Sequence, residues 1–265
     1  MKAFDLAEVN DYPYAREAIS AADGAPLDVL IAYPEGTPKS ILFFIHGGGW
    51  RSDSCERMLP HIRYAALCGA VGVSASYRLL SEKTDVRDGL KDCLAVLDFV
   101  RALCRERYGE LPVVALGDSA GGYYAACLGC RKLVSKIRCG AERADFVVDW
   151  NGITDLTGKW SYGIVQKPSD ESEKEQTERE FSPLYAAAEG DAPVLIMHGD
   201  RDKTVPLSDA YAYRDALDAA GVPAQLCVLE GAAHAFILFG YHHDDGYVAS
   251  VLRAVFAYLA EKNYL

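Results

Sequence analysis

Short apolar segments with the composition of strands alternate along this chain with longer segments of helical periodicity. The predicted strands are 41–45, 71–76, 113–116, 146–150, 194–198 and 225–229. Each is a continuous apolar run, which is typical of parallel strands buried between helices. The predicted helices, with apolar residues at a period near 3.6, are 86–107, 119–132, 207–220 and 246–262. The alternation predicts an α/β fold with a mostly parallel central sheet flanked by helices on both faces.

The whole chain, residues 1–265, is predicted to form one domain. No internal repeat, low-complexity tract or proline-rich linker divides it, and one α/β domain readily fills this length. Residues 17–21 and 27–33, joined across Asp23-Gly24, predict an antiparallel hairpin ahead of the parallel strands. A charge-rich stretch within 166–179 interrupts the alternation. We therefore predict an insertion over 155–185, either a solvated surface segment or, as the less favoured interpretation, one that shapes the mouth of a pocket.

Composition and charge exclude several functional classes. The formal net charge is −11 and no basic cluster occurs, so binding to nucleic acid or to an anionic membrane is not expected. No apolar run approaches the ~20 residues that span a bilayer. The N-terminus lacks the cationic start and apolar core of a signal peptide. These features favour a cytoplasmic protein.

The cysteines and histidines do not form a recognisable metal or redox motif. Eight cysteines are scattered through mostly apolar segments, which favours reduced, buried thiols. Cys127-Leu-Gly-Cys130 has redox-motif spacing but lacks a strand-to-helix redox context, so we predict a packing role. No Cys/His spacing resembles a zinc site. The run HHDD, 242–245, cannot converge on one ion, and we expect an aspartate there to cap a helix.

The sharpest chemical signal is Gly-Asp-Ser-Ala-Gly-Gly, 117–122, between a predicted strand and a predicted helix. Glycines two residues before and after the serine permit a strand-to-helix turn that is too tight for side chains. The serine then projects from the turn in a strained conformation with its Oγ exposed. Ser119 is therefore a candidate nucleophile, which requires a histidine to take its proton and a carboxylate to orient that histidine. Asp118 is expected to serve as a structural hydrogen-bond acceptor.

A second glycine-rich segment, His-Gly-Gly-Gly-Trp at 46–50, follows the predicted strand 41–45. Three glycines leave backbone N–H groups uncovered, and these can donate to an oxyanion that develops on a bound carbonyl. Phosphate binding, the competing use of such a loop, is disfavoured because no Lys-Ser/Thr follows and the spacing fits no nucleotide motif. We expect His46 to support the loop by hydrogen bonding.

Candidate acids and a histidine follow later strands. HGDRDKTVP, 198–206, begins where strand 194–198 ends, and GAAHAF, 231–236, follows the last strand. Serine, acid and histidine thus occur in that order, each after the carboxyl end of a strand, where ligands bind in open α/β sheets. Asp200 and Asp202 are both candidates for the acid. Asp155, after strand 146–150, is a third on topology alone.

Together these motifs resemble the α/β-hydrolase fold, and within it the small esterases related to the hormone-sensitive-lipase group and to bacterial feruloyl and acetyl esterases. The resemblance runs from about residue 40 to the end and includes YRL, 77–79, and SPL, 182–184. It favours Asp202 over Asp200 as the acid. The implied triad is Ser119, Asp202 and His234, and the implied oxyanion hole is formed by the backbone N–H groups of Gly48, Gly49 and Ala120.

The resemblance also implies structural features around the site. Only about 39 residues precede the strand before HGGGW, so the N-terminal cap of larger relatives is expected to be absent or minimal. Leu80-Ser81 stands where the family usually has Ala-Pro. Arg78 and Asp92 resemble a buried ion pair beneath the site. Independently of the resemblance, six aromatic residues near strand ends or in the insertion are candidates to line an aromatic-rich pocket, with core packing as an equally common role: Trp50, Tyr77, Tyr123, Trp150, Trp160 and Phe236. Of these, Trp50, Tyr123 and Phe236 are predicted to bind substrate.

The sequence thus predicts a serine hydrolase that cleaves short-chain or small aromatic carboxylic esters through an acyl-enzyme intermediate. Its expected partner is a small-molecule ester, and no metal or organic cofactor is implied. An arylformamidase or a peptidase on the same fold is the alternative among enzymes. A non-catalytic binding protein on a hydrolase fold is the alternative from another class, and it is disfavoured because all three triad positions are filled.

Overall fold

The computed structural model describes residues 4–21, 23–160 and 171–265. Within them, eight strands form one sheet in the order β1-β2-β4-β3-β5-β6-β7-β8. The strands are β1 (Ala15–Ser20), β2 (Pro26–Ala32), β3 (Ile41–Ile45), β4 (Val71–Ala75), β5 (Val113–Asp118), β6 (Phe146–Trp150), β7 (Val194–Gly199) and β8 (Ala224–Leu229). β1 and β2 form the predicted hairpin, β2 is also antiparallel to β4, and all other pairs are parallel. The predicted mostly parallel α/β architecture is therefore confirmed.

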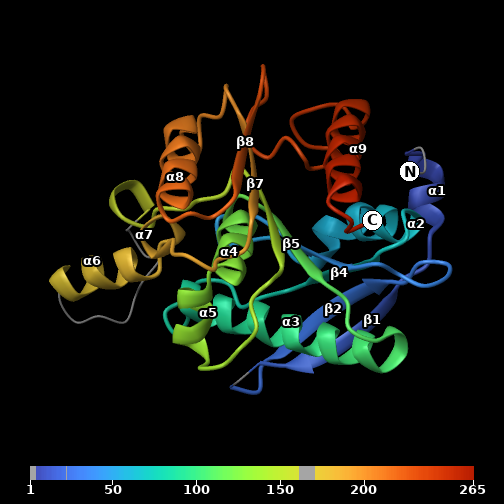
Figure 1. Ribbon diagram of the computed structural model, residues 1–265, viewed down its shortest axis with the longest axis horizontal. Helices are drawn as coiled ribbons and strands as arrows, with labels where there is room; N and C mark the ends of the chain where they lie inside the picture. Colours follow the sequence, from blue (N-terminus) through green and yellow to red (C-terminus); the bar gives the residue numbers. More distant parts are fainter. Residues whose placement is uncertain (1–3, 22, 161–170) are drawn as a thin grey trace.

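Helices cover both faces of the sheet (Figure 1). One face packs against α3 (Val86–Tyr108), α4 (Ala120–Gly129), α5 (Arg131–Ile137) and α8 (Leu207–Ala219). The other packs against α1 (Leu6–Asp11), α2 (Leu59–Leu67) and α9 (Asp245–Glu261). Successive side chains of a strand point to opposite faces, so Phe43 belongs to the first apolar cluster and Phe44 to the second. The sheet thus separates two cores and holds the strand ends rigidly.

The helix predicted over 119–132 is two helices, α4 and α5, which is a correction to the sequence analysis. Cys130 separates them in an extended conformation, with φ −88° and ψ 111°. The carboxylate of Asp191 accepts a hydrogen bond of 2.8 Å from the backbone N–H of Arg131 and so satisfies the start of α5. Burial raises the pKa of the Cys130 thiol to about 12, which fits the predicted packing role.

The expectation that every predicted parallel strand is buried on both faces is wrong for β8. All residues of β3 to β7 are buried, whereas every side chain of β8 is half-buried or exposed. Among the described residues, β8 pairs with β7 alone and therefore forms the edge of the sheet, where one side of the strand has no neighbouring strand to cover it.

The segment predicted as an insertion, 155–185, contains η2 (Gly158–Trp160), α6 (Glu171–Glu180) and all but the last residue of α7 (Pro183–Ala186). The part of the predicted insertion over residues 161–170 lies outside the described residues. Helix α6 lies at the periphery of the molecule, beside α7 (Figure 1). Most of its described side chains are exposed, as expected for a sequence this polar.

The N-terminus of α9 confirms the predicted role of the aspartates in 242–245. Asp244 is the N-cap, and its side chain accepts a hydrogen bond of 3.0 Å from the backbone N–H of Tyr247. Across the three described ranges, no helix combines the length and the apolar character that crossing a membrane requires.

Candidate active site

The turn from β5 to α4 holds Ser119 in a strained conformation, with φ 55° and ψ −116°. A Cβ on Gly117 would lie 2.1 Å from the carbonyl oxygen of Gly121, and a Cβ on Gly121 would lie 2.0 Å from that of Ile45. Only glycine fits at these two positions. The spacing of the motif thus follows from the close approach of α4 to β3 and β5, which forces the serine side chain out of the turn.

His234 lies after β8 and meets this serine. Its Nε2 is 2.9 Å from Ser119 Oγ, and its Nδ1 is 2.7 Å from Asp202 Oδ2. The Asp202 side chain is buried, whereas the His234 side chain remains 14% exposed. Three residues from the ends of three different strands therefore form a continuous hydrogen-bonded chain.

The charge state of Asp202 determines the direction of these hydrogen bonds. Burial alone would raise its pKa, but hydrogen bonds from His234 and from the backbone N–H groups of Thr204 and Val205 outweigh burial and lower it. The ionised carboxylate only accepts, so Nδ1 of His234 carries the proton. Nε2 is then free to accept the hydroxyl proton of Ser119.

The two rival acids are engaged elsewhere. Asp200 accepts a hydrogen bond of 2.7 Å from the backbone N–H of Gly231 and so braces the loop that carries the histidine. Asp155 accepts hydrogen bonds from Thr157 and from the hydroxyl of Tyr185. In the described part of the chain, Asp202 is the carboxylate that contacts the His234 ring.

The glycine loop after β3 lies directly against the serine turn. A Cβ on Gly47 would be 2.6 Å from Asp118 Oδ2 and 3.3 Å from Ser119 Cβ, so a side chain would separate the two segments. Gly48 has φ 101° and its Cβ would clash with Ser52 at 2.3 Å, whereas the space beside Gly49 is open. In the described ranges, the backbone N–H groups of Gly48, Gly49 and Ala120 donate to no protein acceptor.

Two buried side chains hold the glycine loop from beneath. The hydroxyl of Tyr77 is 3.0 Å from the carbonyl of His46 and 3.1 Å from that of Gly47, and its ring stacks on the imidazole of His46. Burial lowers the pKa of His46 to about 4, so this imidazole is neutral. His46 Nδ1 lies 2.8 Å from the carbonyl oxygen of Gly47, so the imidazole also supports the loop by hydrogen bonding, as predicted. Arg78 and Asp92 also form the ion pair that the resemblance implied, at 2.7 Å.

Asn151, which the sequence analysis did not single out, connects the serine turn to the histidine loop. Its Nδ2 donates to Asp118 Oδ1 at 3.0 Å, and its Oδ1 accepts from the backbone N–H of Ala235 at 3.2 Å. The only sequence signal was its place directly after a strand of the site. Asp118, at the centre of this network, is fully buried, and burial raises its pKa to about 6.

Ser119 and His234 open into a cavity of about 300 Å³. Its other lining residues are Gly48, Gly49, Ser52, Asp53, Arg57, Asp118, Ile153, Trp160, Thr204, Ala235, Leu238 and Tyr241. Trp50, Tyr123 and Phe236, the predicted substrate-binding residues, are fully buried and are not among them. Trp50 packs edge-on against both Tyr123 and Trp160, so it lies behind the aromatic residue that reaches the cavity.

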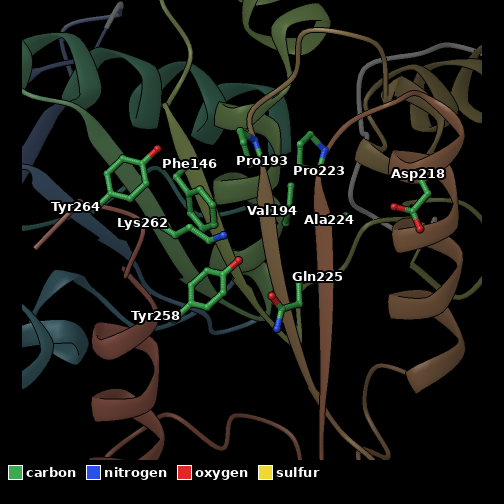
Figure 2. Close-up of a pocket in the computed structure, with 10 residues that line it drawn as sticks. All are labelled: Phe146, Pro193, Val194, Asp218, Pro223, Ala224, Gln225, Tyr258, Lys262 and Tyr264. Atoms are coloured by element: carbon green, nitrogen blue, oxygen red, sulfur yellow. The ribbon is translucent and has the colours of Figure 1, made fainter. Parts of the chain in front are cut away.

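A larger cavity, of about 510 Å³, lies at the amino ends of the parallel strands (Figure 2). It is bordered by Phe146, Val194 and Ala224, the first residues of β6, β7 and β8. Ser119 follows the carboxyl end of the parallel strand β5, so the serine and this cavity lie at opposite ends of the parallel strands.

Comparison with known proteins identifies the family. A family model described as BD-FAE matches residues 27–217, which is most of the chain. The chain belongs to the BD-FAE family. The matched range of this BD-FAE protein runs from β2 into α8 and includes the glycine loop, the serine turn and Asp202.

Curated relatives of this BD-FAE protein are esterases. The probable carboxylic ester hydrolase LipM of Mycobacterium tuberculosis is 26% identical over 218 residues, which cover 76% of this chain and 50% of LipM. An acetyl esterase of Salmonella schwarzengrund is 24% identical over 77% of this chain and 67% of its own length. This chain therefore spans from about half to two thirds of the length of these relatives.

Solved structures confirm the predicted α/β-hydrolase fold. Thermogutta terrifontis esterase 2 phosphorylated by paraoxon is 26% identical, with a TM-score of 0.81 over 96% of both chains. The propionate-bound form of that esterase is 27% identical, with a TM-score of 0.80 over 96% of this chain and 97% of its own.

Proposed function

We propose that this protein is a serine hydrolase that cleaves small carboxylic esters through an acyl-enzyme intermediate. The single observation that carries the proposal is the chain from Ser119 Oγ through both ring nitrogens of His234 to Asp202, with distances of 2.9 and 2.7 Å. The esterase names of the relatives support the same reaction class.

In the proposed first half-reaction, Ser119 Oγ attacks the ester carbonyl while His234 Nε2 takes the hydroxyl proton. Asp202 holds the ring in place and stabilises the imidazolium that forms. The carbonyl oxygen becomes an oxyanion, which accepts hydrogen bonds from the unpaired backbone N–H groups of Gly48, Gly49 and Ala120. The tetrahedral intermediate then collapses, the alcohol leaves with the proton from His234, and the acyl group stays on Ser119.

The second half-reaction repeats these roles with water as the nucleophile. His234 takes a proton from water, which attacks the acyl carbonyl, and the oxyanion forms at the same N–H groups. Collapse of this second intermediate returns the proton to Ser119 Oγ and releases the carboxylic acid. Apart from the ester and the attacking water, every role in the two steps is assigned to a residue of the site.

We propose short acyl groups as substrates, because the cavity holds only about 300 Å³. The propionate- and butyrate-bound forms of Thermogutta terrifontis esterase 2 support this size range. The expected single domain, the minimal cap over 155–185 and the cytoplasmic location remain parts of this proposal. Fractionation of cells that produce the protein with its native ends would test the location.

Labelling with a fluorophosphonate probe, read together with hydrolysis of 4-nitrophenyl acetate, tests the proposed reaction. We expect wild-type protein to react with the probe at Ser119 and to hydrolyse the ester, and Ser119→Ala to do neither. Wild-type protein that is folded but inert toward the probe and the ester would contradict the proposal.

A further inference from the structure

Arg57 lies in the 3-10 helix η1 (Cys55–Met58) and lines the same cavity as Ser119 and His234. In the described part of the chain, its guanidinium forms no ion pair or hydrogen bond, and its Nε is buried without a partner. Several other arginines of this acidic protein pair with carboxylates, such as Arg16 with Asp28 and Arg78 with Asp92, whereas the Nε of Arg63 is likewise buried without a partner. The buried Nε is closed off from the cavity, so a ligand there would bond to the terminal N–H groups of the guanidinium, which have no acceptor among the described residues.

The ring of Tyr241 covers the guanidinium of Arg57, with 5.4 Å between Cζ and the ring centroid. Tyr241 also lines the cavity, and it is 52% exposed, so it stands at the cavity's solvent side. A cation–π contact of this kind supplies no hydrogen-bond acceptor for the guanidinium N–H groups. The arrangement therefore holds the arginine in place without satisfying its donors.

Neither carboxylate that lines the cavity pairs with Arg57. Asp118 accepts a hydrogen bond from Asn151 and lies beneath the glycine loop. Asp53 is exposed at the cavity and forms no ion pair with the arginine among the described residues. Arg57 is the only lysine or arginine among the described residues that line the cavity, so a bound ligand would meet a single permanent positive charge.

We propose that the preferred esters carry a carboxylate, which binds to the guanidinium of Arg57 while the ester carbonyl lies at Ser119. This substrate class rests on the proposed ester hydrolysis. A planar carboxylate matches the fork of guanidinium N–H donors, and one positive charge balances a monoanion rather than a phosphate dianion. The net charge of −11 would repel an anionic substrate at long range, so a local cation is required to hold it.

Two matched pairs of esters test this assignment. The first pair places the carboxylate on the alcohol part of the ester and consists of 4-acetoxybenzoate and the neutral 4-acetoxybenzamide. The second pair places it on the acyl part and consists of monomethyl glutarate and the neutral methyl 4-carbamoylbutanoate. The readout is the ratio of kcat/KM for the acid to kcat/KM for the amide, at fixed pH and ionic strength. General losses of activity cancel in this ratio, whereas a lost carboxylate contact does not.

We expect Arg57→Gln to lower the ratio by about tenfold or more in at least one pair, since a hydrogen bond between charged groups is lost. Arg57→Lys keeps the charge but not the fork of donors, so its ratio should lie between those of wild type and Arg57→Gln. Asp53→Asn is the matched control from the same cavity, and asparagine tolerates its φ of 73°. Removal of this negative charge should raise the ratio and never lower it.

Equal ratios in wild type, Arg57→Gln and Arg57→Lys for both pairs would overturn the assignment. A measurement on unmodified protein covers the case in which Arg57→Gln does not fold. In wild-type protein, benzoate should inhibit hydrolysis of 4-acetoxybenzamide competitively and more strongly than benzamide does. Equal inhibition by the two compounds would also overturn the assignment. If the neutral esters are hydrolysed in a Ser119-dependent way in these experiments, the proposed function stands whatever the ratios show.

Discussion

Asn151 Nδ2 donates a hydrogen bond of 3.0 Å to Asp118 Oδ1, directly beneath the candidate nucleophile. The same amide accepts from the backbone N–H of Ala235, the residue after His234. One buried side chain therefore sets the position of the serine turn relative to the histidine loop. Its backbone has φ 43°, a region that asparagine adopts more readily than most residues.

Replacement of this amide by a carboxylate should misalign the site. We expect Asn151→Asp to lower kcat about tenfold or more while KM changes less, because Asp118 loses a donor and gains a like charge. Steady-state kinetics with 4-nitrophenyl acetate and a thermal melt measure both effects. Asn263→Asp, at an exposed asparagine with φ 66°, is the control. An unchanged kcat in Asn151→Asp would show that the bridge does not position the site.

Removal of the Ser119 hydroxyl should lower kcat by at least about 10³-fold while the fold is retained, as in other serine hydrolases that lose a triad member. Circular dichroism and ester hydrolysis provide the measurement. Ser250→Ala, at an exposed serine of α9, is the control. Full activity in a folded Ser119→Ala would remove this residue from the mechanism.

The two aspartates of the loop after β7 should differ sharply. Asp202→Asn is expected to lower kcat by about 10³-fold or more, since an amide favours the wrong tautomer of His234. Asp200→Asn should have a mild effect, because its acceptor for the backbone N–H of Gly231 is kept. Parallel kinetics of the two variants decide the ranking. The opposite ranking would assign the acid to Asp200.

Asp149 should make the stability of the protein depend on pH. Burial raises its pKa from 3.8 to about 7, so its ionisation disfavours the folded state, and this penalty grows between about pH 4 and pH 7. Asp149→Asn should lose the penalty and keep an acceptor for the backbone N–H of Gly152. Between pH 5 and pH 8 the free energy of unfolding of wild type should fall relative to this variant by about 2–4 kcal/mol.

Denaturant titrations at pH 5 and pH 8 measure that difference, and Asp215→Asn, at an exposed carboxylate of α8, is the control. Parallel stability profiles of wild type and Asp149→Asn would contradict the prediction.

The catalytic efficiency should be highest for esters with short acyl chains. Each methylene contributes ~0.8 kcal/mol only where it leaves water. A cavity of about 300 Å³ accommodates few of them, and the exposed, polar helix α6 offers no apolar cover for more. We expect kcat/KM to peak between acetyl and butyryl esters and to fall by octanoyl in a 4-nitrophenyl ester series. An optimum at decanoyl or longer would reveal an apolar lid.

The sequence by itself determined the features that depend on neighbours along the chain. A tight turn between a strand and a helix needs glycines at fixed offsets, so Gly117, Ser119 and Gly121 were recognisable from spacing alone. The order of strands and helices followed from apolar periodicity for the same reason. The edge position of β8 was not recognisable, because it depends on which strand lies beside it.

Only the tertiary structure decided which side chains from the loops at the carboxyl ends of the strands contact one another. Asp200 and Asp202 are two residues apart in one loop. The resemblance to known esterases favoured Asp202, but the contact itself depends on the path of the chain after β7, which brings Asp202 and not Asp200 to 2.7 Å from His234. Local patterns likewise do not indicate the burial of Trp50 behind the cavity or the position of Arg57 inside it. Those outcomes depend on packing between segments that are distant along the chain, and no spacing within a motif encodes such contacts.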